Sequence, residues 1–353
     1  MIRRTSENSW LLIAQTEHAR IAAELARAWG NDRFAPLSLA DWLVPAIRHH
    51  DDGWSDWDDA PHVDPETGTP RDFTEMAMAD ATAIWRRSIA VCSRAAGRAA
   101  SGSQCLARLD NWLRPQQLPL TRDHEFILAQ ILEATEPLTE QTLTESADEA
   151  SDETAAQPVP VILQQLQQAG VIVPRTITSE TGFVLSADLQ APSPFGGLWV
   201  SRHFCDLAIR ARENRTEAAD LAAIDDFLNE QAPLQAEWRE QLAAQIPEDE
   251  LEPLIELGFR CVQRFDHLSL WLCCAERDKP FELAFPGAGQ IHFIPGPDGQ
   301  VVVDPWPFAA DRLELVATPV RIPRQSYRND EALHTEMAAS RGTVLRWILL
   351  SAQ

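Results

Sequence analysis

Three helical patterns in this sequence each carry a histidine or an aspartate on their apolar side, where a polar group needs a partner. At helical spacing, the apolar neighbours are Ile21, Ala22, Leu25 and Trp29 for His18, Leu43 and Ile47 for His50, and Phe259, Val262, Leu270 and Cys273 for Asp266. A buried carboxylate without a partner costs several kcal/mol, and a buried imidazole needs hydrogen bonds. A shared cation satisfies both, because imidazole nitrogens and carboxylate oxygens suit Zn, Mn, Fe, Co or Mg. The sequence therefore predicts a buried site for a divalent metal.

Two further residues belong to this candidate site. Asp51 follows His50 directly, and neighbouring helical residues point about 100° apart, so both reach one ion only near a helix end. A helix end is predicted here, since Gly53 follows where a left-handed stop is needed. His203 lies on the apolar side of another helical pattern, with Trp199, Val200 and Leu207.

Taken singly, each of these residues has a simpler interpretation. A lone histidine on an apolar face is more often a satisfied core residue than a metal ligand. Asp266 alone could cap a buried loop or pair with Arg202 or Arg264. The metal interpretation rests on the residues occurring together.

The composition limits the classes of function. The chain has 353 residues, enough for one large domain or two moderate ones, and a formal net charge of −23. So acidic a protein is not expected to bind nucleic acid or a membrane surface as its main partner. No apolar stretch reaches the roughly 18–20 residues of a membrane span, and the run at 10–14 is too short for a signal peptide. We expect a cytoplasmic protein with reduced cysteines and a small-molecule substrate; the oligomeric state stays open.

Most of the sequence predicts helices, interrupted by one insertion. A strand within 1–14 precedes a helix over 16–29, with Thr16 as N-cap and Gly30 as stop. Another helix ends in 47–54 and has Pro45 in its first turn. Further helical patterns cover 74–100, 196–214, 217–245 and 250–277. The polar stretch 53–73 is typical of a long loop that serves a site. Residues 133–160 hold eight acidic residues and no basic ones, which indicates a flexible surface insertion.

The pattern changes at Phe281. Short β-prone runs follow, separated by the turns PGAG and PGPDG: FELAF, QIHFI, VVVD, RLELVATPV and TVLRWILL. They predict a small antiparallel sheet of four or five strands. We therefore expect a mainly α fold that is α+β overall. Its helical domain spans 1–280, with the flexible insertion at about 133–160, and a β-rich subdomain over 281–353 packs on it.

The spacing of the candidate ligands resembles the HD-domain superfamily. Its core is His…His-Asp-x-Gly…Asp on a helical scaffold, and this chain has His18, a His-Asp-Asp-Gly stretch from His50, and Asp266 on a late helix. The stretches QTEHARIAAELA and HHDDGWSDWDDAP, with a downstream Ser-x-His-Phe, also resemble an uncharacterised bacterial family, a domain of unknown function, over residues 1 to about 350. The HD likeness covers only the helical part. It implies an HD-type helical bundle in which His18, His50, Asp51 and Asp266 are the primary metal ligands.

The resemblance leaves the number of metal ions open. His203 would match an intermediate histidine that holds a second ion or contacts a phosphate. HD sites with two ions use two such histidines, and this sequence offers one convincing candidate. His62 or His124 could supply the other, whereas His49 and His267 are expected to point elsewhere. We therefore expect one ion, with a second possible.

The HD likeness implies a phosphohydrolase that acts on a small phosphorylated molecule or a nucleotide. The metal would lower the pKa of a bound water and polarise a phosphoryl oxygen. The catalytic candidates are Asp51, Asp52 and His203, with Asp52 as a base or a support. The candidates that could bind the substrate phosphate, or only form surface salt bridges, are Arg86, Arg87 and Arg202.

Two alternatives stay open at this point. A minority of HD-type proteins resemble di-iron oxygenases, whose ligand set needs two intermediate histidines. The chain could also be a non-catalytic metal-containing binding protein, with the acidic insertion as a docking segment. Trp54 and Trp57 in the 53–73 loop could line a pocket or anchor the core.

Overall fold

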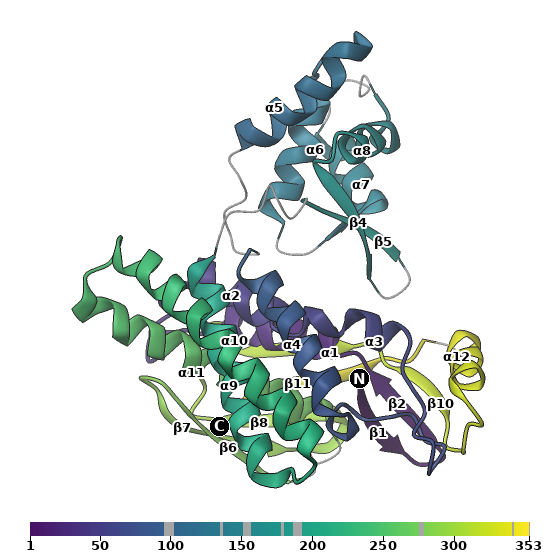
Figure 1. Ribbon diagram of the computed structural model, residues 1–353, viewed down its shortest axis with the longest axis vertical. Helices are drawn as coiled ribbons and strands as arrows, with labels where there is room; N and C mark the ends of the chain where they lie inside the picture. Colours follow the sequence, from purple (N-terminus) through teal and green to yellow (C-terminus); the bar gives the residue numbers. More distant parts are fainter. Residues whose placement is uncertain are drawn as a thin grey trace. The chain divides into compact units, whose positions relative to one another are not determined.

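The computed structural model describes residues 1–94, 102–134, 137–150, 157–177, 180–185, 193–274, 279–340 and 342–352. The chain forms two compact units (Figure 1). The larger unit comprises Met1–Ser93 and Ser193–Gln353, and the smaller unit comprises Arg94–Pro192. All residues of the candidate metal site belong to the larger unit.

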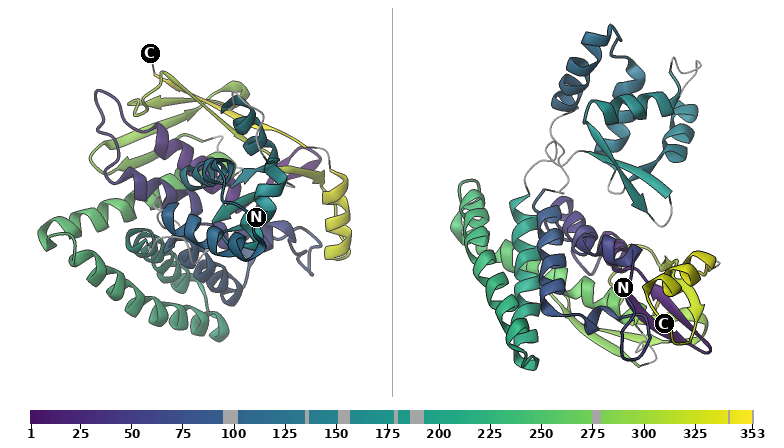
Figure 2. Two further views of the ribbon diagram at one scale, coloured as in Figure 1. Left: turned by 90° about the horizontal axis from the view of Figure 1, so that it is seen from above. Right: turned by 45° about the vertical axis from the view of Figure 1, so that its right-hand side comes forward.

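Helices make up most of the larger unit, as the sequence predicts. They include α1 (Gln15–Ala28), α2 (Ala40–His49), α4 (Met78–Cys92), α9 (Pro194–Asn214), α10 (Ala218–Ala243) and α11 (Glu248–Cys273). α1 packs against α2 and α11, and α9 packs against α4, α10 and α11, as the views in Figure 2 show. Their apolar faces meet in one core, whose fully buried rings include Trp199, Phe204, Phe227 and Phe265.

Two helices of this unit begin earlier than the sequence predicts. α1 begins at Gln15, whose backbone N–H donates to the buried carboxylate of Asp58 at 2.7 Å, so Thr16 is not the N-cap. α2 begins at Ala40 and holds Pro45 inside the helix, not in its first turn. A proline at that position leaves one backbone carbonyl without its intrahelical donor. Burial of the surrounding apolar residues of α2 outweighs that loss.

The N-terminal residues form a hairpin, where the sequence analysis expected one strand. β1 (Ile2–Ser6) pairs antiparallel with β2 (Ser9–Ile13), and β10 (Val320–Pro323) adds to the other edge of β2. The turn between β1 and β2 places Glu7 at φ 42°, which reverses the chain within the run.

The C-terminal sheet has five strands, in the order β6-β7-β8-β11-β9. Its strands are β6 (Phe281–Phe285), β7 (Gly289–Pro295), β8 (Gln300–Asp304), β9 (Arg312–Ala317) and β11 (Leu345–Ser351). The prediction of a purely antiparallel sheet was wrong, because β11 pairs parallel with β8. The helix α12 (Asp330–Ala339) lies between β10 and β11 in the chain and was not predicted. The sheet packs on the helices through contacts of β9 with α1 and of β6 with α11.

The 53–73 segment is not the structureless loop that the sequence analysis expected. It contains the short helices η1 (Asp52–Trp54) and α3 (Ser55–Asp59), a bridge between Val63 and Pro70, and the start of η2 (Phe73–Glu75). The Asp72 side chain caps η2. α4 therefore begins at Met78 and not at residue 74; of the predicted helix over 74–100, residues 95–100 lie outside the described part of the chain.

Along the sequence, the smaller unit lies between the two segments that form the larger unit. It contains α5 (Gly102–Leu113), η3 (Arg114–Gln116), α6 (Arg122–Glu133), α7 (Glu140–Ala150), α8 (Val159–Gln168), β3 (Leu138–Thr139), β4 (Ile172–Ile177) and β5 (Glu180–Leu185). Its own core includes Leu109, Leu128, Leu143 and Leu163. The acidic stretch 133–160 includes α7, with Leu143 fully buried, while 135–136 and 151–156 lie outside the described residues. The segment that separates the two parts is thus 94–192.

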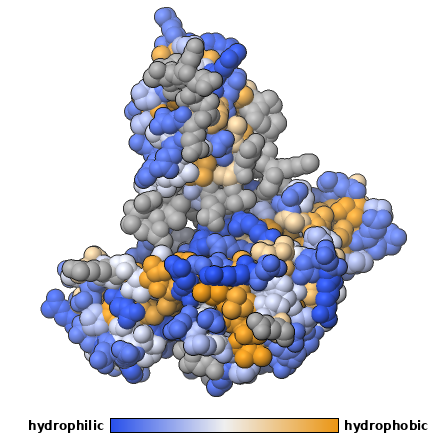
Figure 3. Space-filling view, turned by 180° about the vertical axis from the view of Figure 1, so that it is seen from behind, coloured by the Kyte–Doolittle hydropathy of each residue, from blue (hydrophilic) through white to orange (hydrophobic). Residues whose placement is uncertain are grey.

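Hydrophilic residues cover much of the face seen from behind, with separate hydrophobic patches between them (Figure 3). Among the described residues, no helix is both long and apolar enough to cross a membrane.

Candidate metal centre

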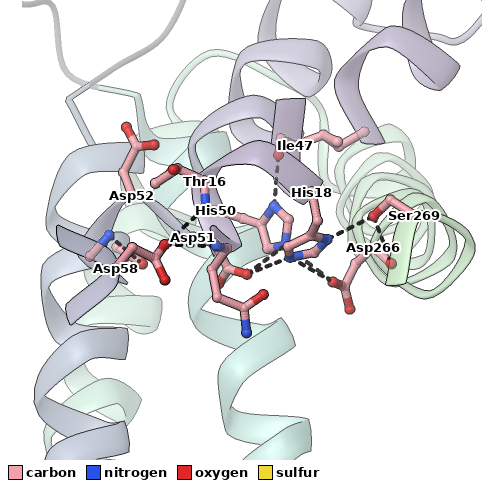
Figure 4. Close-up of polar contacts among 12 residues, drawn as sticks. Thr16, His18, Ile47, His50, Asp51, Asp52, Asp58, Asp266 and Ser269 are labelled. Carbon is pink, nitrogen blue, oxygen red and sulfur yellow. Dashed lines mark hydrogen bonds and ion pairs between the residues drawn. The ribbon is translucent and has the colours of Figure 1, made fainter. Parts of the chain in front are cut away.

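Three helices of the larger unit bring the four candidate ligands together. His18 lies in α1, His50 caps the C-terminal end of α2 with Asp51 directly after it, and Asp266 lies in α11. The backbone leaves the helical conformation at Asp51 (φ −111°, ψ 17°), which lets adjacent residues reach one point. One donor atom of each residue lies within 4.8 Å of the others, and Figure 4 shows the side chains converging. The cluster can hold a metal ion.

The His18 ring presents the lone pair of Nε2 to the cluster. The Ser269 hydroxyl donates its hydrogen to the Asp266 backbone carbonyl at 2.9 Å, so its oxygen accepts from His18 Nδ1 at 2.8 Å. With the proton on Nδ1, the unprotonated Nε2 faces Asp51 Oδ2 at 2.7 Å and Asp266 Oδ1 at 3.8 Å. Two lone pairs cannot approach so closely without a proton or a cation between them.

The His50 ring is oriented in the same way by a different partner. Its Nδ1 donates to the Ile47 backbone carbonyl at 2.7 Å. Its Nε2 lies 3.2 Å from Asp266 Oδ1 and 3.5 Å from Asp51 Oδ2. A histidine that donates its other ring N–H to a backbone carbonyl or a hydroxyl is typical of protein metal sites.

The spacing and charge of these atoms fit one divalent ion. Ligand atoms that share an ion through bonds of about 2.1 Å lie about 3–4 Å apart, close to the separations in the cluster. Two carboxylates and two neutral imidazoles carry two negative charges, which a divalent cation neutralises. The ligands are buried in the fold, so solvent screens that charge only weakly.

The pKa shifts of His50 and Asp266 also indicate that a positive charge is stabilised within the cluster. Burial alone would lower the pKa of His50, but the carboxylates of Asp51 and Asp266 outweigh it and raise the pKa to about 9. Burial favours the protonated form of Asp266, yet the imidazoles of His50, His203 and His18 hold the pKa of this carboxyl well below its usual range. A proton or a cation at this point supplies that charge.

His203 lies beside the four-ligand cluster. Its Nε2 is 3.7 Å from Asp266 Oδ2, and its ring packs edge-on against the His50 ring. Its Nδ1 is buried and has no hydrogen-bond partner among the described residues. Burial lowers the pKa of His203, so the ring is neutral near pH 7. A buried polar atom without a protein partner indicates a ligand or water as its partner.

A cavity of about 230 Å³ opens on this cluster. His18, Asp51, His203 and Asp266 all contribute to its wall. The rest of the wall is mainly apolar, and it includes Trp54, the tryptophan of the 53–73 segment that the sequence analysis left open between pocket and core. An ion in the cluster would therefore face a space that a small molecule can enter.

The structure does not bring the other predicted site residues to the cavity. Asp52 accepts a hydrogen bond from His49 Nδ1 at 2.7 Å and points away from the cluster (Figure 4). The three arginines proposed for phosphate binding have protein partners elsewhere: Glu230 for Arg86, the Gly53 carbonyl for Arg87, and Glu256 for Arg202. None of these four residues lines the cavity.

The two other histidines considered as ligands, His62 and His124, lie away from the cluster, and His267 points elsewhere as predicted. His62 is exposed and pairs with Asp330 at 2.7 Å. His124 belongs to the smaller unit, where its Nε2 bonds Gln165 Oε1 at 2.7 Å. The His267 ring packs against Phe281.

Four further groups contribute to the site and were not predicted from the sequence. Ser269 and the Ile47 carbonyl orient the two imidazoles. Gln15 lines the cavity one turn before His18, and its buried Oε1 has no partner among the described residues. Arg215 is the cationic side chain of the cavity wall. Gln15 and Ser269 could have been predicted, because each lies three residues from a candidate ligand, His18 or Asp266, and residues at that spacing share a helix face.

The fold and site define a mainly helical protein with small sheets and a buried His/Asp cluster that can hold a metal ion. The chain belongs to the family described as Protein of unknown function (DUF3891), whose model matches residues 1–97 and 184–324. These two segments include every residue of the cluster, and the stretch between them lies within the smaller unit. The comparison with curated proteins found no match, and neither did the comparison with solved structures.

Proposed function

We propose that this protein is an HD-type, metal-dependent hydrolase that acts on a small phosphorylated molecule. The observation that carries the proposal is that all four candidate ligands are buried, yet three of them also line a cavity. Structural metal sites are closed by protein ligands, whereas catalytic sites keep a position open for water or substrate. A cluster on a cavity wall is therefore suited to catalysis.

His18, His50, Asp51 and Asp266 would hold one divalent ion, of Fe, Mn, Zn, Co or Mg. Such an ion, when bound, supplies Lewis acidity to a phosphoryl oxygen and lowers the pKa of a water molecule. His203, neutral because burial lowers its pKa, can accept a proton from that water. Gln15 Oε1 can accept a hydrogen bond from the same water or from a substrate hydroxyl, which would orient it for attack.

The ligand count favours hydrolysis over HD-type di-iron oxygenation. The described residues provide one cluster of four ligands, with His203 as the single further histidine that contacts it. A di-iron centre of the HD type needs two intermediate histidines. His62 and His124 are committed to other partners.

The test combines elemental analysis with turnover. Purified protein, as isolated and after loading with Mn²⁺, Fe²⁺, Co²⁺ or Zn²⁺, is assayed for bound metal and for release of phosphate from p-nitrophenyl phosphate and from nucleotides. We expect about one ion per chain and a hydrolytic activity that the His50→Ala, Asp51→Ala double variant loses. His62→Ala, an exposed histidine outside the cluster, is the matched control and should keep both.

The outcomes separate the alternatives. No bindable transition metal would overturn the proposal. Intact metal binding without turnover across a broad panel of esters would instead support a non-catalytic binding protein. An iron-dependent mixed-valence signal would support the oxygenase.

A further inference from the structure

Two helices, α4 and α9, supply much of the wall of the cavity beside the candidate metal centre, and their lining residues recur at helical spacing. On α9 they are His203, Leu207, Ala211 and, just past the helix end, Arg215, each four positions after the last. This spacing places them on one face, one above the other. Twelve residues at 1.5 Å each separate His203 from Arg215 by roughly 18 Å along the helix. The cavity is therefore elongated.

α4 lines the opposite wall and runs antiparallel to α9. Trp85 stacks on Phe204, next to His203, with ring centroids 5.3 Å apart. At the other end, Arg215 donates to the carbonyl of Met76, two residues before α4 begins. Met78, Ala81 and Trp85 also line the cavity and lie at helical spacing. The residues of both walls therefore indicate that the cavity extends from the candidate metal cluster toward Arg215.

The two ends of the cavity differ in chemistry. Gln15, His18, Asp51, His203 and Asp266 make the inner end polar. The middle, between α4 and α9, is lined by apolar side chains. The outer end has the exposed Thr74 and the partly exposed Arg215. No arginine or lysine is among the residues that line the inner end, so the metal would supply the positive charge there.

We propose that this cavity is a channel for a phosphate monoester of a small apolar alcohol, with the phosphate at the metal cluster and the apolar body between α4 and α9. This inference rests on the proposed function and narrows its substrate. A nucleotide fits poorly, because its sugar and base carry polar groups that the apolar walls leave without hydrogen bonds. The volume of about 230 Å³ lies below the roughly 300–1,000 Å³ of sites for drug-sized ligands, which also favours a small substrate.

The test measures binding of non-hydrolysable n-alkylphosphonates, from methyl to decyl, to the full-length metal-loaded protein by calorimetry. Each added methylene that enters the channel should tighten binding about fourfold, until the chain reaches the outer end. Adenosine monophosphate should bind more weakly than hexylphosphonate. Ala211→Phe fills the channel about two thirds of the way from His203 to Arg215, so the gain should stop at a shorter chain. Ile209→Phe on the exposed side of α9, where Ile209 is 52% exposed, is the control and should leave the series unchanged.

The outcomes distinguish the channel from the hydrolase. If the protein binds methylphosphonate and hydrolyses phosphate esters but shows no dependence on chain length, the channel is overturned and the proposed function stands. If adenosine monophosphate binds as tightly as hexylphosphonate, the apolar channel is likewise overturned and the proposed function stands. A third outcome is that n-alcohols show the same dependence on chain length and that each phosphonate binds no more tightly than the alcohol of equal length. The cluster then does not bind phosphate, and the proposed function is overturned. Metal content and methylphosphonate affinity of Ala211→Phe show that the variant is folded.

Discussion

At the scale of single residues, the candidate site depends on partners that the sequence does not reveal. Helical spacing places His18, His50 and Asp266 on apolar faces, so their burial was predictable. The direction of each ring was not, because it is set by Ser269 and by the Ile47 carbonyl across helix contacts. The sequence predicted Arg86 and Arg202 as substrate-binding residues, whereas Arg215, which was not predicted, is the one of the three that lines the cavity.

Removal of the Ser269 hydroxyl should weaken metal binding without removing a ligand. In Ser269→Ala, His18 Nδ1 loses its acceptor, and the ring is no longer fixed with Nε2 toward Asp51. Loss of such a partner lowers metal affinity by about 10–100-fold. Competition with a chromophoric chelator measures the change. Ser201→Ala, which removes a buried serine hydroxyl bonded to Gln231, is the control; equal losses in both variants would refute the role of Ser269.

The pKa of His50 predicts how metal affinity depends on pH. Its pKa in the metal-free fold is raised from 6.5 to about 9, so its proton stabilises the fold below pH 6.5, and this contribution is lost as pH rises through 9. A metal ion must displace that proton from Nε2. Affinity should therefore rise about tenfold per pH unit as pH increases toward about 9, and then level off.

Metal titrations at fixed ionic strength between pH 6 and pH 10 test this dependence. A pH-independent affinity between pH 7 and pH 9 would show that no proton occupies the cluster in the metal-free protein.

At the scale of helices and strands, local patterns predicted the elements better than their partners. The β-prone runs and the turns between them identified the strands of the five-stranded sheet, and alternate side chains of β7 and β8 are buried. It could not show that β11 inserts between β8 and β9, because the chain returns there only after α12. Likewise, local propensity predicts Pro45 in the first turn of a helix, but it lies inside α2, because burial of the apolar residues around it stabilises the longer helix.

A close contact between α9 and α11 predicts that one glycine is sensitive to substitution. A Cβ on Gly258 of α11 would lie 2.1 Å from Cε2 of Trp199 on α9, and Trp199 is fully buried. Gly258→Ala should therefore push the two helices apart and lower the free energy of unfolding by about 1–3 kcal/mol. The shift should also weaken metal binding, because Asp266 lies two turns further along α11.

Urea denaturation with and without metal measures both effects. Gly342→Ala is the matched control, since a Cβ there meets no atom within 4 Å. A Gly258→Ala variant as stable as the control would mean that the two helices are not in this close contact.

At the scale of the whole chain, the smaller unit is the feature that composition concealed. The acidic residues of 133–160 suggested a flexible insertion, but apolar residues on both sides of that stretch form a separate core, which includes Leu109, Leu128 and Leu163. Their mutual contacts are non-local, so no single window of sequence displays them. The family match over 1–97 and 184–324 covers most of the larger unit, and all four candidate ligands lie within these two segments.

The geometry where the smaller unit leaves and rejoins the larger one predicts that it can be removed. Ser193 N–H donates to the Ser93 carbonyl at 2.7 Å, so the two ends of the insertion meet within the larger unit. Replacing 95–191 by a short Gly/Ser linker closes a gap that a few residues can span, and loop closure of that length costs little. None of the four candidate ligands, and none of the residues that line the cavity, lies in the removed segment.

We therefore expect the shortened chain to fold and to bind about one metal ion with an affinity within about threefold of the full chain. Elemental analysis, chelator competition and thermal unfolding of the two proteins make the comparison. A shortened chain that folds but loses metal would show that the smaller unit contributes to the site. A second variant with a longer linker controls for strain at the junction, where Ser93 and Ser193 are hydrogen-bonded. If neither variant folds, the larger unit needs the smaller one for stability.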